Sequence, residues 1–217
     1  MKLLFPLVTA DIALFTLIDQ RLRVLLVQRA EEPSIANWAL PGGILKPDED
    51  NSMEETAKRA LVTKVKVVVP HLEQVATFSG SKRDPRGWSL SVLFFALLPA
   101  DQVQAVAGER TEAIRWCDPV HGAPELAFDH RQLLDKALHQ LRDKVERGAL
   151  PLHLLDQQFT LTDLQRACEA ITGRSLDKAA FRRQIKDSSC LAAVEGVYLR
   201  GPQRPAQIYS ASPEFNF

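Results

Sequence analysis

The chain has 217 residues, 25% of them charged, and its 27 Lys and Arg residues balance 27 Asp and Glu residues. This length suits two domains, and the neutral balance excludes attraction to nucleic acid by bulk charge, so any basic surface must be local. Three widely spaced cysteines without a CxxC pair exclude a disulfide scaffold and favour reduced thiols inside a cell.

The N-terminal segment 1–18 begins with Lys2 and an apolar run, as a signal peptide does. Asp11 interrupts this run and the segment continues into strand-like sequence, so a buried first strand is the better interpretation. No run reaches the roughly 18 apolar residues that a membrane-spanning helix needs. The sequence therefore predicts a soluble, cytoplasmic protein with no membrane partner.

Short segments rich in aliphatic and β-branched residues predict strands. They cover residues 8–18, 23–29, 67–70, 73–78, 89–98 and 113–117, with a polar turn at 19–21. A helical pattern separates the first strands from the later ones. This order predicts an α+β sandwich with a mixed sheet, not a repeated βαβ array.

A second helical pattern covers 130–147, with an apolar stripe that favours core packing over a dimer seam. Gly148 and Pro151 follow in the order expected at a helix end. Asp129 before the helix is interpreted as its N-cap. These features close a first domain, which is predicted to span 1–148.

Residues 155–217 predict a second, smaller domain. Thr162 and Ser175 are the predicted caps of two short helices, and Gly173 ends the first of them. Two helices joined by a tight turn with glycine indicate a helix-turn-helix arrangement.

The strand-like segments 194–200 and 206–210 would then form a hairpin that projects as a wing. On the second helix, Lys178, Arg182 and Lys186 recur at four-residue spacing. Such a row can enter a major groove, and Arg200 and Arg204 on the hairpin can grip phosphate or the minor groove. An ordinary solvated helix face fits the same row.

The stretch 42–67, GGILKPDEDNSMEETAKRALVTKVKV, contains a predicted helix with Ser52 as N-cap and Glu55 at capping-box spacing. It resembles the Nudix box, which holds a divalent metal and a diphosphate in Nudix hydrolases. Gly43 and Glu49 match the front of that pattern. A short insertion after Glu49 brings Arg59 onto its arginine.

The resemblance places the three box glutamates on Ala60, Thr63 and Lys64, and the late glycine on Lys66. Because residues three and four apart share a helix face, this face offers a methyl, a hydroxyl and an ammonium where Mg²⁺ requires carboxylate oxygens. The prediction is a domain with no catalytic residues and no metal. Weak metal binding remains an alternative for the nearby acids Glu49, Asp50, Glu54 and Glu55.

A second cluster, KRDPRGW at 82–88, combines three cations, a turn and an aromatic side chain. Such a cluster can pair with a diphosphate and stack on a base or ribose. A charged hairpin turn with Trp88 in the core is the alternative. The predicted ligand-binding residues are Arg29, Trp38, Gly42, Gly43, Arg83, Asp84, Arg86 and Trp88.

Taken in order, LLVQRA, WALPGG, the stretched box, SKRDPRGW, LAFDH, FTLTDLQ, FRRQI and GPQRPAQIY resemble the NrtR family of Nudix-related regulators. The resemblance implies a Nudix-like α/β/α sandwich followed by a small winged helix-turn-helix domain. It implies a homodimeric repressor of NAD biosynthesis or salvage genes that binds a palindromic operator in double-stranded DNA. ADP-ribose or a related diphosphate would be the effector, with no cofactor.

The FRR motif of the family matches Phe181, Arg182 and Arg183. The predicted DNA-binding residues are therefore Lys178, Arg182, Arg183, Lys186, Arg200 and Arg204. An active ADP-ribose pyrophosphatase with an accessory C-terminal domain is the alternative function.

Overall fold

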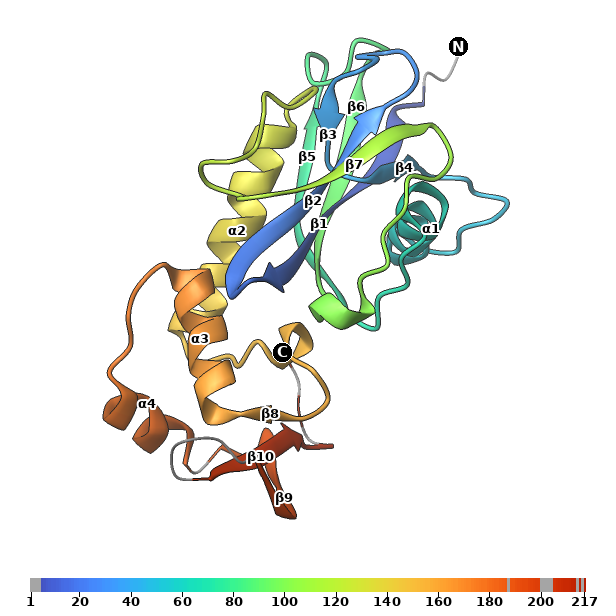
Figure 1. Ribbon diagram of the computed structural model, residues 1–217. Helices are drawn as coiled ribbons and strands as arrows, with labels where there is room; N and C mark the ends of the chain where they lie inside the picture. Colours follow the sequence, from blue (N-terminus) through green and yellow to red (C-terminus); the bar gives the residue numbers. More distant parts are fainter. Residues whose placement is uncertain (1–4, 187, 200–204, 214, 216) are drawn as a thin grey trace.

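The computed structural model describes residues 5–186, 188–199, 205–213, 215 and 217. It shows a larger N-terminal unit, in which a sheet lies between two helices, and a smaller C-terminal unit below it (Figure 1). The helices that flank the sheet are α1 (Met53–Val65) and α2 (His130–Glu146). Within the described residues, no helix is both long enough and apolar enough to cross a membrane.

The large sheet has seven strands within the described residues and follows the order β3-β2-β1-β6-β5, with β4 paired to β1 and β7 paired to β2. The strands are β1 (Leu7–Ile18), β2 (Arg21–Arg29), β3 (Trp38–Ala39), β4 (Gly42–Ile44), β5 (Leu72–Gly80), β6 (Ser89–Leu97) and β7 (Thr111–Cys117). β1 and β6 run parallel, whereas the other pairs run antiparallel. The predicted mixed sheet is confirmed.

Both faces of β1 are apolar, which explains why a helix covers each side of the sheet. Successive side chains of a strand point to opposite faces. Ala13 and Phe15 pack in the core cluster on the α2 side, whereas Ile12 and Leu14 pack in the cluster on the α1 side.

β1 and β2 separate toward the start of β1. They pair only from Phe15 opposite Val24 to Ile18 opposite Arg21. Beyond this point β1 pairs with β4, where Asp11 faces Gly42, and β2 pairs with β3 and β7. The separation opens a space at this end of the sheet.

The predicted strand at 67–70 is wrong. After α1, Lys66 adopts a left-handed conformation with φ 59°, and the following residues form no strand. Val67 and Val69 are nevertheless buried in the α1-side cluster. The alternation of buried and exposed valines therefore arises because this segment packs on the core, although it pairs with no other strand.

The C-terminal unit contains α3 (Leu161–Thr172), α4 (Lys178–Ile185) and a three-stranded sheet in the order β8-β10-β9. The strands are β8 (Phe159–Thr160), β9 (Leu191–Leu199) and β10 (Ala206–Ala211). Hydrophobic side chains of both helices, including Leu164, Cys168, Phe181 and Ile185, form its core. This is the predicted helix-turn-helix with a hairpin.

The predicted caps of these helices are wrong, although Gly173 does end α3 with φ 72°. Thr160, not Thr162, caps α3 in a reciprocal capping box with Asp163, and Asp177, not Ser175, caps α4. In each case the residue just before the helix accepts a hydrogen bond from the third helical N–H, which the predicted residues are too far along or too early to do.

A buried linker joins the two units. Leu152 and Leu154 of the short 3-10 helix η2 (Leu152–Leu154) are buried. Ile171 of α3 belongs to the α2-side core cluster of the large unit, and the Arg142 guanidinium donates to its carbonyl at 2.9 Å. Helix α2 thus packs on the large sheet and on the C-terminal unit.

Candidate ligand pocket and nucleic-acid interface

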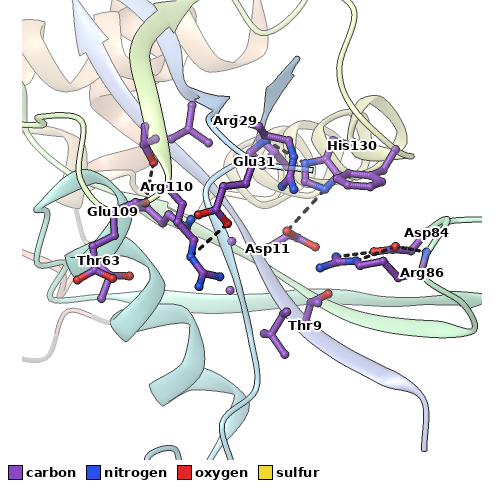
Figure 2. A pocket seen from close by; sticks show the side chains of 18 of the residues that line it. Thr9, Asp11, Arg29, Glu31, Thr63, Asp84, Arg86, Glu109, Arg110 and His130 are labelled. Carbon is purple, nitrogen blue, oxygen red and sulfur yellow. Dashed lines mark hydrogen bonds and ion pairs between the residues drawn. The ribbon is translucent and has the colours of Figure 1, made fainter. Parts of the chain in front are cut away.

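A cavity of about 430 Å³ opens where β1 and β2 separate (Figure 2). Such a volume falls within the range of small-molecule sites. Its lining combines both signs of charge. The cationic side chains are Arg29, Lys46, Arg59, Lys64, Arg83, Arg86 and Arg110, and the acidic ones are Asp11, Glu31, Glu32, Asp84 and Glu109.

Six of the eight residues predicted to bind ligand line this cavity: Arg29, Gly42, Gly43, Arg83, Asp84 and Arg86. Trp38 and Trp88 do not line it. Trp38 packs against the α2-side core, and Trp88 is 49% exposed on the surface. The exposure of Trp88 contradicts the alternative that it is a core residue, and its role as a stacking platform stays a prediction.

Carboxylates hold the two arginines of the 82–88 loop in fixed positions. Arg83 donates two hydrogen bonds of 2.9 Å to Asp129, and Arg86 donates to Asp84 at 3.0 and 2.7 Å. Burial raises the pKa of Asp84, but hydrogen bonds from Arg86 together with the charges of Arg86 and Arg83 leave this pKa below its ordinary value. Asp129 is the N-cap residue of α2, as predicted, but its side chain makes no capping hydrogen bond. Its side chain instead ties the loop to the start of α2.

Two polar residues that the sequence analysis did not assign to the site form part of the cavity wall. They are Asp11 on β1 and His130, the first residue of α2. His130 accepts a hydrogen bond from the backbone N–H of Leu40 at its Nδ1, 3.0 Å away, and burial lowers its pKa. The ring is therefore neutral, with its proton on Nε2. For these two residues, the only signal in the sequence was the charge of Asp11 inside an apolar run.

The α1 face beneath the cavity has no carboxylates at the positions aligned with the Nudix glutamates. A Cβ at Gly43 would lie 3.1 Å from the Ala60 Cβ, so the two chains are in close contact there. The Thr63 hydroxyl donates to the carbonyl of Arg59 at 2.9 Å. Lys64 lines the cavity, and burial, then the charges of Arg110 and Arg29, lower its pKa.

The acids near the front of the box are engaged with other partners. Arg59 donates to Asp50 at 2.7 and 2.5 Å, which holds the pKa of that carboxyl well below its ordinary value. Glu49 and Glu54 pair with lysines, and Glu55 accepts from Asn51. No group of three or more His, Cys, Asp or Glu side chains suited to a metal occurs within the described residues.

The surface of α4 carries the predicted DNA-binding cations. Lys178, Arg182, Arg183 and Lys186 are exposed, whereas Phe181 and Ile185 anchor the helix in the core of the small unit. Within the described residues, none of these four cations forms an ion pair. Arg200 and Arg204 lie outside the described residues.

Comparison with known proteins identifies the two units. The NUDIX domain model matches residues 8–137, and the NrtR DNA-binding winged helix domain model matches residues 151–211. The ADPR responsive transcriptional repressor NtrR of Acinetobacter baylyi is 40% identical over 218 residues, which cover 98% of this chain and 86% of the relative. The chain belongs to the NrtR family. The predicted family, its Nudix fold and its winged helix are thereby confirmed.

Two solved structures of the NrtR family are similar to this chain. Shewanella oneidensis NrtR complexed with a 27mer DNA shares 36% identity and a TM-score of 0.82, covering 95% of this chain and 94% of that one. The NUDIX domain of Shewanella oneidensis NrtR complexed with ADP ribose shares 39% identity and a TM-score of 0.59, covering 64% and 90%. The NrtR family thus combines a Nudix domain with a winged helix for transcription regulation.

Proposed function

We propose that the protein is a homodimeric repressor of NAD biosynthesis or salvage genes that senses ADP-ribose. One observation carries this proposal. Helix α2 begins at the cation-lined cavity, where His130 forms part of the wall, and ends against α3, where Arg142 bonds the carbonyl of Ile171. The effector site and the DNA-binding unit therefore share one helix.

ADP-ribose fits the chemistry of the cavity. Arginine pairs with phosphate oxygens in planar, two-point contacts, and Arg29, Arg83 and Arg86 all line the space. The related Shewanella Nudix domain was crystallised with ADP ribose. These facts support a diphosphate effector and give no reason to invoke a cofactor.

We also propose that the domain does not hydrolyse its ligand. At about 4 Å and an effective dielectric of about 20, two like unit charges repel by about 4 kcal/mol, and a divalent ion doubles this cost. The ammonium of Lys64 in the cavity therefore opposes a metal. The absence of carboxylates at Ala60 and Thr63 supports the same conclusion.

Coupling to DNA requires that ADP-ribose bind the two conformations of the dimer with different affinities. Arg83 is the residue best placed to create this difference, because it holds Asp129, which directly precedes α2. A phosphate that binds Arg83 competes with Asp129 for the guanidinium. The start of α2 would then shift and carry the winged helix with it.

In this proposal residues 1–148 sense the effector and 155–217 bind DNA in the cytoplasm. Two subunits read the two half-sites of a palindromic operator. Arg182 and Arg183 enter the major groove, and the cations of the wing contact phosphate.

The test begins by selecting duplexes that the purified full-length protein binds from a random library. Fluorescence anisotropy then follows binding of a selected duplex while ADP-ribose is added with Mg²⁺, and chromatography of the same sample follows AMP. We expect ADP-ribose to weaken DNA binding at least tenfold without producing AMP. Steady release of AMP would favour the pyrophosphatase, and unchanged DNA affinity at saturating ADP-ribose would exclude the sensor.

A further inference from the structure

Asp11 lies on the same face of β1 as buried apolar residues, where an apolar side chain is expected. It lies two and four residues before Ala13 and Phe15, which are buried on the α2 side of the sheet, and only 7% of its surface is exposed. Removing a carboxylate from water is costly unless it finds hydrogen-bond partners. The partners of its two oxygens therefore indicate what the residue does.

Only one oxygen of this carboxylate has a hydrogen-bond donor within the described residues. Oδ2 accepts from the Ser91 hydroxyl of β6 at 2.5 Å. Oδ1 lies 3.7 Å from the Nε2 of His130, which is too long for a hydrogen bond. Figure 2 shows the Asp11 carboxylate directed toward the His130 ring, and both side chains line the cavity.

Gly42 makes room for this carboxylate. A Cβ at position 42 would lie 2.1 Å from Asp11 Oδ1 and 2.8 Å from the carbonyl of Ala10. Any side chain would therefore either collide with the carboxylate or displace it. The pairing of β4 with β1 thus brings the carboxylate against the backbone of β4, a close approach that only glycine at position 42 permits.

Asp11 and His130 have complementary roles. Oδ1 of Asp11 accepts hydrogen bonds only. His130 uses its Nδ1 lone pair on the N–H of Leu40, so its Nε2–H is left to donate. A hydroxyl both donates and accepts, and two neighbouring hydroxyls match an acceptor and a donor that lie 3.7 Å apart.

The surrounding charge indicates which hydroxyls these are. Asp11 lines the same cavity as Arg29 and Arg86, and its charge adds to that of Asp84 in raising the pKa of Arg86. In a nucleoside diphosphate sugar each ribose adjoins a phosphate, whereas the base lies farther away. Recognition of ribose hydroxyls by a carboxylate beside a diphosphate site is an established solution in dinucleotide-binding proteins.

We propose that Asp11 and His130 form a ribose subsite of the effector pocket. Asp11 Oδ1 accepts a hydrogen bond from the 2-hydroxyl of one ribose, and His130 Nε2 donates to the neighbouring 3-hydroxyl. This assignment rests on the proposed function, since it makes the ligand a ribose diphosphate. It also makes Asp11 a determinant of specificity, because a ligand without the diol leaves the buried oxygen unpaired.

Titration calorimetry of the full-length protein tests the subsite with three ligands. They are ADP-ribose and the two analogues that each lack the 2-hydroxyl of one ribose. We expect the wild type to bind one analogue about tenfold or more weakly than ADP-ribose, as for a hydrogen bond to a charged group. Asp11→Ala should bind ADP-ribose more weakly and should no longer distinguish it from that analogue.

The control is Asp135→Ala, which removes an exposed carboxylate that pairs with Arg131 on α2. This variant should discriminate as the wild type does. Equal affinity of the wild type for all three ligands would overturn the subsite without requiring any variant to fold, and so would full discrimination by a folded Asp11→Ala. A wild type that does not bind ADP-ribose would contradict the proposed function itself, and the subsite with it.

Discussion

The arginines of the cavity and those of α4 differ in whether a carboxylate binds them. In the cavity, Arg59, Arg83 and Arg86 each make two hydrogen bonds to a carboxylate. On α4, Arg182 and Arg183 are exposed and, within the described part of the chain, form no ion pair. The same residue type is thus fixed in one region and free in the other.

This difference matches two kinds of ligand. A small diphosphate needs donors in fixed positions, since ordering them on binding would cost affinity. Duplex DNA presents a regular row of phosphates and a groove, and binding to it gains from released counterions. Paired arginines therefore suit the effector, and free arginines suit the operator.

Charge reversal on α4 should produce the largest effect. Arg182→Glu combined with Arg183→Glu should weaken binding to a selected operator by about a hundredfold or more, because each lost contact costs about 1–3 kcal/mol. Anisotropy measures this loss, and calorimetry should show unchanged affinity for ADP-ribose. Lys136→Glu on the exposed surface of α2 is the control. Operator affinity equal to that of the wild type would remove α4 from the interface.

For a fixed arginine such as Arg59, removal of the charge of its carboxylate partner should lower the stability of the protein. Asp50→Asn should lower the free energy of unfolding by about 2 kcal/mol, less than a fully buried pair because the Arg59 side chain is 21% exposed. Arg59 lowers the folded-state pKa of Asp50 below its ordinary value of 3.8. The pair therefore stabilises the protein above about pH 4, and the stabilisation is lost as pH falls through the folded-state pKa.

Urea unfolding at several pH values measures this contribution. The acid side of the stability profile should be flatter in Asp50→Asn than in the wild type. Asp48→Asn, which changes an exposed carboxylate of the same loop, should leave both the profile and the stability unchanged. A wild-type slope in Asp50→Asn would show that the pair is not responsible.

Arg83→Lys tests whether fixed geometry matters more than charge. Lysine keeps the charge but cannot make the planar two-point contact that a guanidinium makes with phosphate, so affinity for ADP-ribose should fall about tenfold. Calorimetry measures the affinity. Arg131→Lys is a matched control, since Arg131 also makes two bonds to one carboxylate but does so on the surface of α2. Equal losses in both variants would point to a general effect on α2.

The smallest effect is expected at the contact between the large unit and the linker to the C-terminal unit. His153 of η2 stacks on His71 with ring centroids 4.7 Å apart, and burial lowers the pKa of His153 from 6.5 to about 4. The unfolded chain therefore binds a proton that the folded chain excludes between these values. Stability should fall as pH drops from about 6.5 toward 4.

His153→Phe keeps a stacking ring and should remove about 1 kcal/mol of this pH dependence, since partial exposure reduces the effect. Thermal unfolding at pH 7.5 and pH 5 measures the difference. His139→Phe on the exposed part of α2 should retain the wild-type pH dependence. Retention in His153→Phe as well would assign the dependence to other groups.

Local patterns in the sequence determined most of the fold. Runs rich in aliphatic and β-branched residues predicted β1 and β2, and helical periodicity predicted α2 within one residue of its observed end. The spacing of Ala60, Thr63 and Lys64 placed them on one face of α1. These features depend on neighbours within a few positions, so the sequence expresses them directly.

Only the tertiary structure decided which polar residues share the cavity. Asp11 bonds a serine 80 positions away, Arg83 bonds an aspartate 46 positions away, and His130 bonds a backbone N–H 90 positions away. Local propensity carries no information about such pairs, because they exist only after β1 and β2 separate and α2 packs on the sheet. For the same reason the sequence predicted Trp38 and Trp88 as ligand-binding residues, although neither lines this cavity, and gave no such role to Asp11, which does line it.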